Sequence, residues 1–130
     1  MIKQLKTYKS PVLAIEISDS FQEADYKLVQ IWADAKREKG FEKANILIKL
    51  DELKISESSI KAIFEQLIKL LKNFRQFGRI AIVAQSNSLK KMVQIENFFL
   101  QKLSKGSEER YFDISELEEA FAFVESDLTN

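Results

Sequence analysis

The sequence predicts an α/β fold with a largely parallel sheet. Short segments of alternating or continuous apolar residues are separated by amphipathic segments of ten or more residues, which is the pattern of βαβ units. Serine or asparagine tends to precede the amphipathic segments and glycine to follow them, as at helix ends. Because 130 residues suit one domain and no linker or repeat interrupts the pattern, we expect a single domain over residues 1–130.

The first half of the chain contains two predicted strands and one helix. Residues 1–10 carry spaced lysines that are typical of a charge-protected edge strand. Residues Pro11–Ser18 alternate as a half-buried strand does. A helix follows, with Ser20 and Glu23 at capping-box spacing and Gly40 as its C-terminal glycine. Its expected buried stripe is Leu28, Ile31, Trp32 and Ala35.

The second half repeats this alternation. Residues Ala44–Leu50 form a second alternating strand, and Arg79–Ala84 is apolar enough to be a central strand buried on both faces. Residues Asn87–Gly106 predict a helix, Arg110–Ile114 a last strand, and Ser115–Ser126 a closing helix with serine as its N-cap. The buried residues expected of the helix after the second alternating strand and of the closing helix are Ile60, Ile63, Phe64, Leu67, Ile68, Leu71, Phe74, Leu117, Phe121 and Val124.

Composition excludes most enzyme chemistry. The chain has no cysteine and no histidine, which removes disulfides, thiolate nucleophiles, histidine-based triads and two-histidine zinc sites. Its three glycines fit neither phosphate-binding nor dinucleotide-binding patterns. We therefore expect no catalytic residue, no metal site and no cofactor, and do not expect an enzyme. Twenty basic and twenty acidic residues balance, which argues against a nucleic-acid partner.

The sequence contains no segment that would direct it into a membrane. Its N-terminus lacks the apolar stretch of a secretory signal, and no apolar run approaches the roughly 20 residues that a membrane helix requires. We expect a cytoplasmic protein with no transmembrane segment.

Three segments resemble the SpoIIAA-like family of small bacterial proteins. They are "MIKQLKTYKSPVLAIEISDSFQEADYKLV", "FRQFGRIAIVAQSNSLKKMV" and "ERYFDISELEEAFAFV", which span nearly the whole chain. The most specific parts are the Asp25-Tyr26 pair, the strand Arg79–Val83 and the strand Arg110–Asp113. This family is related in fold to the STAS domains of sulfate transporters and anti-sigma-factor antagonists, and to lipid-binding CRAL-TRIO domains.

The resemblance implies a two-layer (βα) superhelix. Its mixed, mostly parallel sheet has about five strands in sequential order, with about four helices mainly on one face. Asp19 stands where the family has a glycine before the first helix.

The resemblance leaves two non-enzymatic functions open. One is a regulatory protein-interaction module like the STAS-type anti-sigma-factor antagonists, with a protein partner or a second copy of the chain. The other is a carrier for a lipid or other apolar small molecule, which the ten phenylalanines would suit.

Serines at the start of the helix after the second alternating strand admit two interpretations. STAS antagonists are phosphorylated on a serine at the start of the helix after their third strand, and the matching place here holds Ser58 and Ser59. A phosphate is electrostatically acceptable there, because free N–H groups and the helix dipole favour negative charge. The simpler interpretation is a helix start, with Ser56 as N-cap, and Ile60 replaces the motif's glycine. The pattern favours the helix start and leaves the phosphorylation switch open.

One face of the predicted sheet is a candidate interaction surface. If that face carries no helix, its partly apolar lining would be exposed and would drive homodimer formation or docking of another protein. In that case Val83→Lys should abolish the complex without unfolding the domain. The residues expected on this face are Ala14, Glu16, Leu47, Lys49, Ala81 and Val83.

Overall fold

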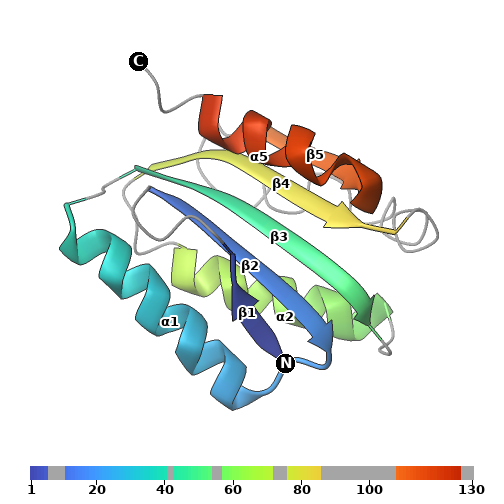
Figure 1. Ribbon diagram of the computed structural model, residues 1–130. Coiled ribbons are helices and arrows are strands. Elements are labelled where there is room, and N and C mark those ends of the chain that lie inside the picture. Colours follow the sequence, from blue (N-terminus) through green and yellow to red (C-terminus); the bar gives the residue numbers. More distant parts are fainter. Residues whose placement is uncertain (6–10, 41–42, 54–56, 72–75, 86–107, 127–130) are drawn as a thin grey trace.

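The computed structural model describes residues 1–5, 11–40, 43–53, 57–71, 76–85 and 108–126 (Figure 1). The predicted helix at 87–106 therefore lies outside the described residues. The elements, in chain order, are strand β1 (Ile2–Gln4), strand β2 (Val12–Asp19), helix α1 (Glu23–Glu38), strand β3 (Lys43–Leu53), helix α2 (Glu57–Leu71), strand β4 (Gln76–Ala84), strand β5 (Glu108–Asp113), the 3-10 turn η2 (Ile114–Glu116) and helix α5 (Leu117–Ser126).

The five strands form one sheet in sequential order, β1-β2-β3-β4-β5. β1 is antiparallel to β2, and the remaining pairs are parallel. This confirms the predicted fold class. The steps from β2 to β3 and from β3 to β4 run in the same direction across the sheet, so right-handed crossovers place α1 and α2 on one face. Figure 1 shows both helices below the sheet, whereas α5 lies above it.

The face of the sheet that α1 and α2 cover holds the larger apolar core. Every second residue of β2, β3 and β4 points into it, as the alternation of the strands predicts. Phe64 of α2 is fully buried at its centre. The buried residues of this core include Leu13, Ile15, Ile17, Val29, Ala33, Ile46, Ile48, Ile63, Leu67, Ile68, Ile80 and Ile82.

The predicted buried stripe of α1 is wrong except for Trp32, which is partly buried and packs against the larger core. Val29, Ala33 and Lys36 are buried instead, whereas the side chain of Leu28 is 40% exposed and that of Ile31 is 61% exposed. α1 is apolar around much of its circumference, so the sequence contains two candidate stripes on opposite sides of the helix. Packing against the sheet buries the side that carries Val29 and Ala33.

The two ends of α1 differ in how well they were predicted. The N-cap is Gln22 rather than Ser20, and the capping box joins it to Asp25, whose carboxylate accepts the Gln22 N–H at 2.9 Å. At the other end Gly40 adopts φ of 90° and donates to the carbonyl of Arg37, which confirms the C-terminal glycine.

The face expected to be open is covered, which corrects that expectation. α5 packs on β4 and β3, and Ala120, Phe121, Phe123 and Val124 form a second core with the sheet. The four apolar members of the candidate interaction surface are fully buried in this core, because their small or medium side chains allow the helix to approach closely. They are Ala14, Leu47, Ala81 and Val83.

The two charged members of that surface form an ion pair. Glu16 and Lys49 are register partners on β2 and β3, and the Lys49 ammonium donates to the Glu16 carboxylate at 2.6 Å. Because β2 and β3 are neighbouring strands, the pair forms within one chain. Both side chains are about four-fifths buried, so the pair closes the rim of the second core instead of leaving it open.

Candidate functional site

The first turn of α2 lies beyond the carboxyl end of strand β3. α2 begins at Glu57, shortly after β3 ends at Leu53. Ser58 and Ser59 are therefore the second and third residues of the helix that follows the third strand. The predicted N-cap, Ser56, lies outside the described residues. Both candidate serines therefore lie in the first turn of α2.

The neighbouring turn, after β2, has an unusual backbone. Asp19 adopts φ of 60°, a left-handed conformation that glycine reaches freely and that aspartate tolerates better than most residues. The N–H of Ser20 donates to the carbonyl of Ser18 at 2.8 Å and closes the turn. Asp19 therefore adopts a backbone conformation that glycine would favour, and it leads the chain into α1.

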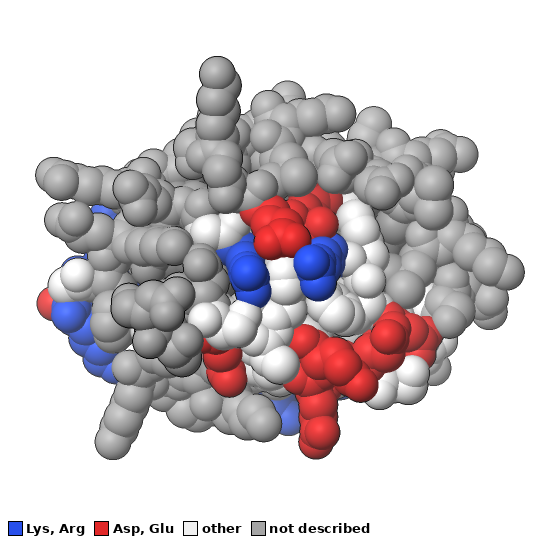
Figure 2. Space-filling view, turned by 90° about the horizontal axis from the view of Figure 1, so that it is seen from above, with Lys and Arg blue, Asp and Glu red and all other residues white. Residues whose placement is uncertain are grey.

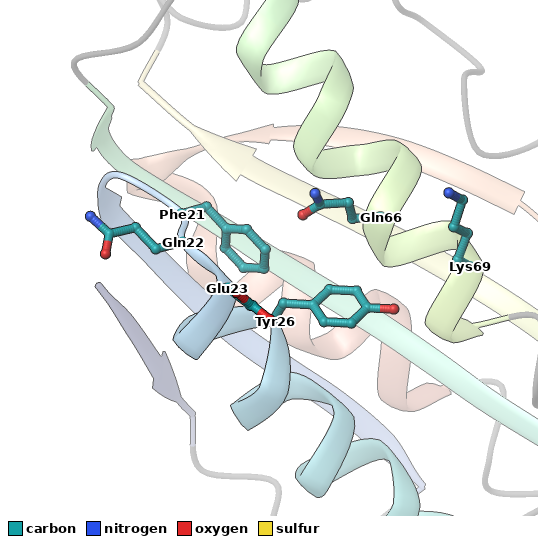
Figure 3. Close-up of a pocket in the computed structure, with 6 residues that line it drawn as sticks. All are labelled: Phe21, Gln22, Glu23, Tyr26, Gln66 and Lys69. Carbon is teal, nitrogen blue, oxygen red and sulfur yellow. The ribbon is translucent and has the colours of Figure 1, made fainter.

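A pocket of about 370 Å³ opens between the start of α1 and the second half of α2 (Figure 3). The half-buried rings of Phe21 and Tyr26 form its apolar part, and both pack on the larger core. Lys69 and Gln66 approach from α2, and Figure 3 shows the Tyr26 ring directed toward Lys69. Exposed Gln22 and Glu23 complete the lining.

The pocket combines aromatic surface with hydrogen-bonding side chains. Its volume is at the small end of the range for ligand pockets, which begins at roughly 300 Å³. The Lys69 ammonium offers a cationic donor, and the side-chain amides of Gln22 and Gln66 can donate or accept. This lining suits a small amphipathic molecule with an apolar body and a polar or anionic head.

Polar contacts fix α5 to the sheet at the opposite face. The side chain of fully buried Asn45 donates to the Val124 carbonyl at 2.6 Å and accepts the Arg79 N–H at 2.8 Å. The Arg79 guanidinium donates to the Phe123 carbonyl at 3.0 Å. These bonds reach two carbonyls in the last turn of α5, where a helix leaves its carbonyls without backbone partners of its own. This helix is therefore joined to the domain by directional bonds as well as by apolar packing.

Two guanidinium groups flank one aromatic ring on this face. Arg79 lies 4.8 Å and Arg110 4.7 Å from the centre of the Phe123 ring, and Glu108 forms ion pairs with both arginines. Figure 2 looks down on this side and shows basic side chains at its centre with acidic ones on either side. Because the charges alternate and are paired, the cluster is a structural clamp on α5.

Comparison with known protein families identifies the family of this chain. The model of the SpoIIAA-like family matches residues 12–125, which covers the whole sheet except β1 and all three described helices apart from the last residue of α5. The chain belongs to the SpoIIAA-like family. No curated protein and no solved structure matches it significantly.

Most of the residues that carried the SpoIIAA-like resemblance have structural roles. Asp25 caps α1, and Arg79 and Arg110 hold α5. Asp113 caps η2, where its carboxylate accepts the N–H of Ser115 at 3.0 Å, so Ser115 is not the N-cap that the sequence predicts. Tyr26 is the exception, since it lines the pocket.

Sequence reasoning did not find the pocket. Its lining comes from the β2–α1 connection and the first turn of α1 on one side and from α2 on the other, and some forty residues of sequence separate the two sides. Paired aromatics at the start of α1 were a usable signal, but the partners on α2 are ordinary exposed helix residues.

Across the ranges that the structure describes, no helix is both long enough and apolar enough to cross a bilayer.

Proposed function

We propose that this SpoIIAA-like chain is a non-enzymatic regulatory module that binds another protein through the first turn of α2. The observation that supports the proposal is the position of Ser58 and Ser59, in the first turn of the helix that follows the third strand. The STAS-type antagonists that the family resembles carry their regulated serine at this place. A phosphate there would meet free backbone N–H groups and the positive end of the helix dipole.

Phosphate mapping is the direct test. Cleavage after Lys54 and Lys61 releases the peptide Ile55–Lys61, which contains all three serines of the junction. Fragmentation mass spectrometry of this peptide, from protein isolated from its own cells, should show phosphate on Ser58 or Ser59. A peptide that carries phosphate at neither serine under any growth condition would leave the helix-start interpretation alone.

Partner binding gives the second half of the test. Ser58→Asp should change the recovery of the bound protein several-fold relative to wild type, and Ser58→Ala should match the unmodified chain. The control is Gln85→Asp, which adds the same charge at an exposed position after β4, on the same edge of the sheet. If Gln85→Asp and Ser58→Asp act alike, only the charge of the edge matters and the serine has no specific role.

The pocket between α1 and α2 supports a second candidate, a carrier of an apolar small molecule. Phe21 and Tyr26 would hold the apolar body of the ligand, and Lys69 would bind its head. Organic extraction of the purified protein followed by mass spectrometry should then recover one small molecule at close to one per chain. Phe21→Ala and Tyr26→Ala should lower that ratio, and Glu118→Ala on exposed α5 surface should not.

A further inference from the structure

The outer side of α1 carries an exposed apolar stripe. Among the described residues, the large apolar side chains that are exposed are Met1, Leu28 and Ile31, and two of these three lie on α1. Ala24 and Ala35 are exposed on the same side. Along α1, the residues Ala24, Leu28, Ile31 and Ala35 follow one another at intervals of four, three and four residues, which places them on one side of a helix. Figure 1 shows α1 at the outside of the helix layer, below the sheet. The stripe is thus contiguous, exposed and turned away from the core.

Two ion pairs flank this stripe along one side. Glu23 pairs with Lys27 at 3.8 Å in the first half of α1, and Asp34 pairs with Arg37 in the second half. Along the helix the signs read negative, positive, negative, positive. Reversing the direction of the helix places the opposite sign at each of these positions.

We propose that α1 binds α1 of a second copy of this chain in an antiparallel, two-fold symmetric pair. In such a pair residue i contacts residue j and residue j contacts residue i. Leu28 then packs against Ile31 of the second copy, and Ala24 packs against Ala35. The midpoints of both pairs fall at about position 30, so one two-fold axis accounts for the whole stripe. The alanines at both ends allow the helices to approach closely.

The flanking charges agree with the same axis. A two-fold axis perpendicular to the helices brings the charged side of one copy against the same side of the other. Glu23 then lies beside Arg37 of the second copy, and Lys27 lies beside Asp34. Their midpoints also fall at about position 30, so apolar and charged residues select one register independently. Glu38, which is exposed at the end of the stripe, stays at the solvated rim.

The area that the two α1 helices can bury determines how tightly the two copies are expected to associate. One pair of 16-residue helices buries less than the roughly 1,200 Å² at which stable interfaces begin. We therefore expect a reversible dimer that forms at concentrations on the order of 100 µM and dissociates on dilution. This interface is distinct from the first turn of α2 and does not depend on phosphorylation there.

Sedimentation of the full chain over a concentration series up to about 1 mM tests the proposal. Wild type should shift from monomer to dimer, and Ile31→Lys should weaken association at least tenfold with unchanged circular dichroism. Glu118→Lys, at an exposed site on α5, is the matched control and should associate like wild type. A wild-type chain that stays monomeric, or an Ile31→Lys chain that dimerises normally, overturns the proposal.

A pair of charge-reversal variants tests the register in which the two α1 helices pack. Lys27→Glu places two acids together across the axis, and Asp34→Lys places two bases together, so each variant alone should associate several-fold more weakly than wild type. An equimolar mixture of the two variants restores opposite charges at both places and should form a heterodimer at wild-type strength. A mixture that associates no better than either variant alone rules out this antiparallel register, and folding defects in one variant would not produce the rescue.

Discussion

The two faces of the sheet each bury a polar side chain, but the two side chains differ in charge and in their surroundings. Within the described ranges, each face buries one such residue, Lys36 on α1 and Asn45 on β3. The side-chain amide of Asn45 donates to α5 and accepts from β4, so its hydrogen-bonding capacity is used in a fixed geometry. Lys36 is only 2% exposed, and burial, with a smaller contribution from Lys39, lowers the pKa of its ammonium to about 8.

The difference shows that equal burial has opposite consequences for stability. A buried amide with matched partners fixes the position of a helix at little net cost. A buried ammonium is destabilised relative to its state in the unfolded chain, because folding removes water that favours the charged form. The buried polar group of the α5 face therefore anchors a helix through two hydrogen bonds, whereas burial lowers the pKa of the buried ammonium on the α1 face.

The largest expected effect is that of Val83→Lys on the α5 face. Val83 is fully buried under α5, so the substitution forces a charged side chain into an apolar core. We expect it to destabilise the domain by at least about 4 kcal/mol, which is enough to prevent folding of many domains of this size. Urea denaturation followed by circular dichroism measures this.

Val83→Ala is its control. It should cost only about 1–2 kcal/mol and leave the fold intact, because it removes volume without adding charge. If the Val83→Lys chain folded as stably as wild type, α5 would not cover this face, and the open interaction surface expected from the sequence would be restored.

Asn45→Ala should have the next largest effect. The substitution leaves the Val124 carbonyl and the Arg79 N–H without their buried partner. We expect a loss of about 2–4 kcal/mol in the free energy of unfolding, with faster amide hydrogen exchange in α5 than in α2. Gln66→Ala, at an exposed amide on α2, should change stability by less than about 0.5 kcal/mol. Equal losses for the two variants would contradict the anchoring role of Asn45.

Lys36→Met should stabilise the protein by about 2 kcal/mol at neutral pH. The native pKa of about 8 lies below the ordinary lysine pKa of 10.5, so between these values the unfolded chain binds more protons than the native one. Wild-type stability should consequently rise between about pH 8 and pH 10.5, and the penalty is fully present below pH 8. Lys36→Met should remove this rise, whereas the exposed Lys69→Met should keep it. A wild-type stability that is flat over this range would contradict the assignment.

The smallest effect is expected for the Glu16–Lys49 pair at the rim of the α5 face. Its two groups keep partial contact with solvent, and the attraction is offset by desolvation. A double-mutant cycle with Glu16→Gln and Lys49→Met should give a coupling free energy of roughly 0.5–1 kcal/mol, reduced by salt. A coupling above about 2 kcal/mol would mean that the pair is as integral to this face as Asn45.

The strands and the core of α2 were predictable from the sequence because the spacing of their apolar residues is compatible with only one buried side for each element. In β2, β3 and β4 the alternation assigns each side chain to a face, and the structure confirms both sets. The stripe Ile63, Phe64, Leu67 and Ile68 of α2 is likewise confirmed. Gly40 was predictable because a left-handed residue after a helix favours glycine.

The orientation of α1 and the position of α5 were not predictable, because local pattern leaves both undecided. α1 offers apolar residues on two opposite sides, and only contact with the sheet decides that Val29 and Ala33 are buried while Leu28 and Ile31 are exposed. The pocket depends on the same contact, since Tyr26 meets α2 only in this orientation of the helix.

By itself, the sequence determined the fold class, the family and the absence of histidine and cysteine chemistry, because these depend on residue type and on periodicity along one segment. Only the tertiary structure decided that α5 covers the second face of the sheet. Asn45 and Arg79 give no sign in the sequence that they bind the last turn of a helix some eighty and forty-five residues away. Such contacts form between distant segments, so their free energy is realised only when the whole chain is folded.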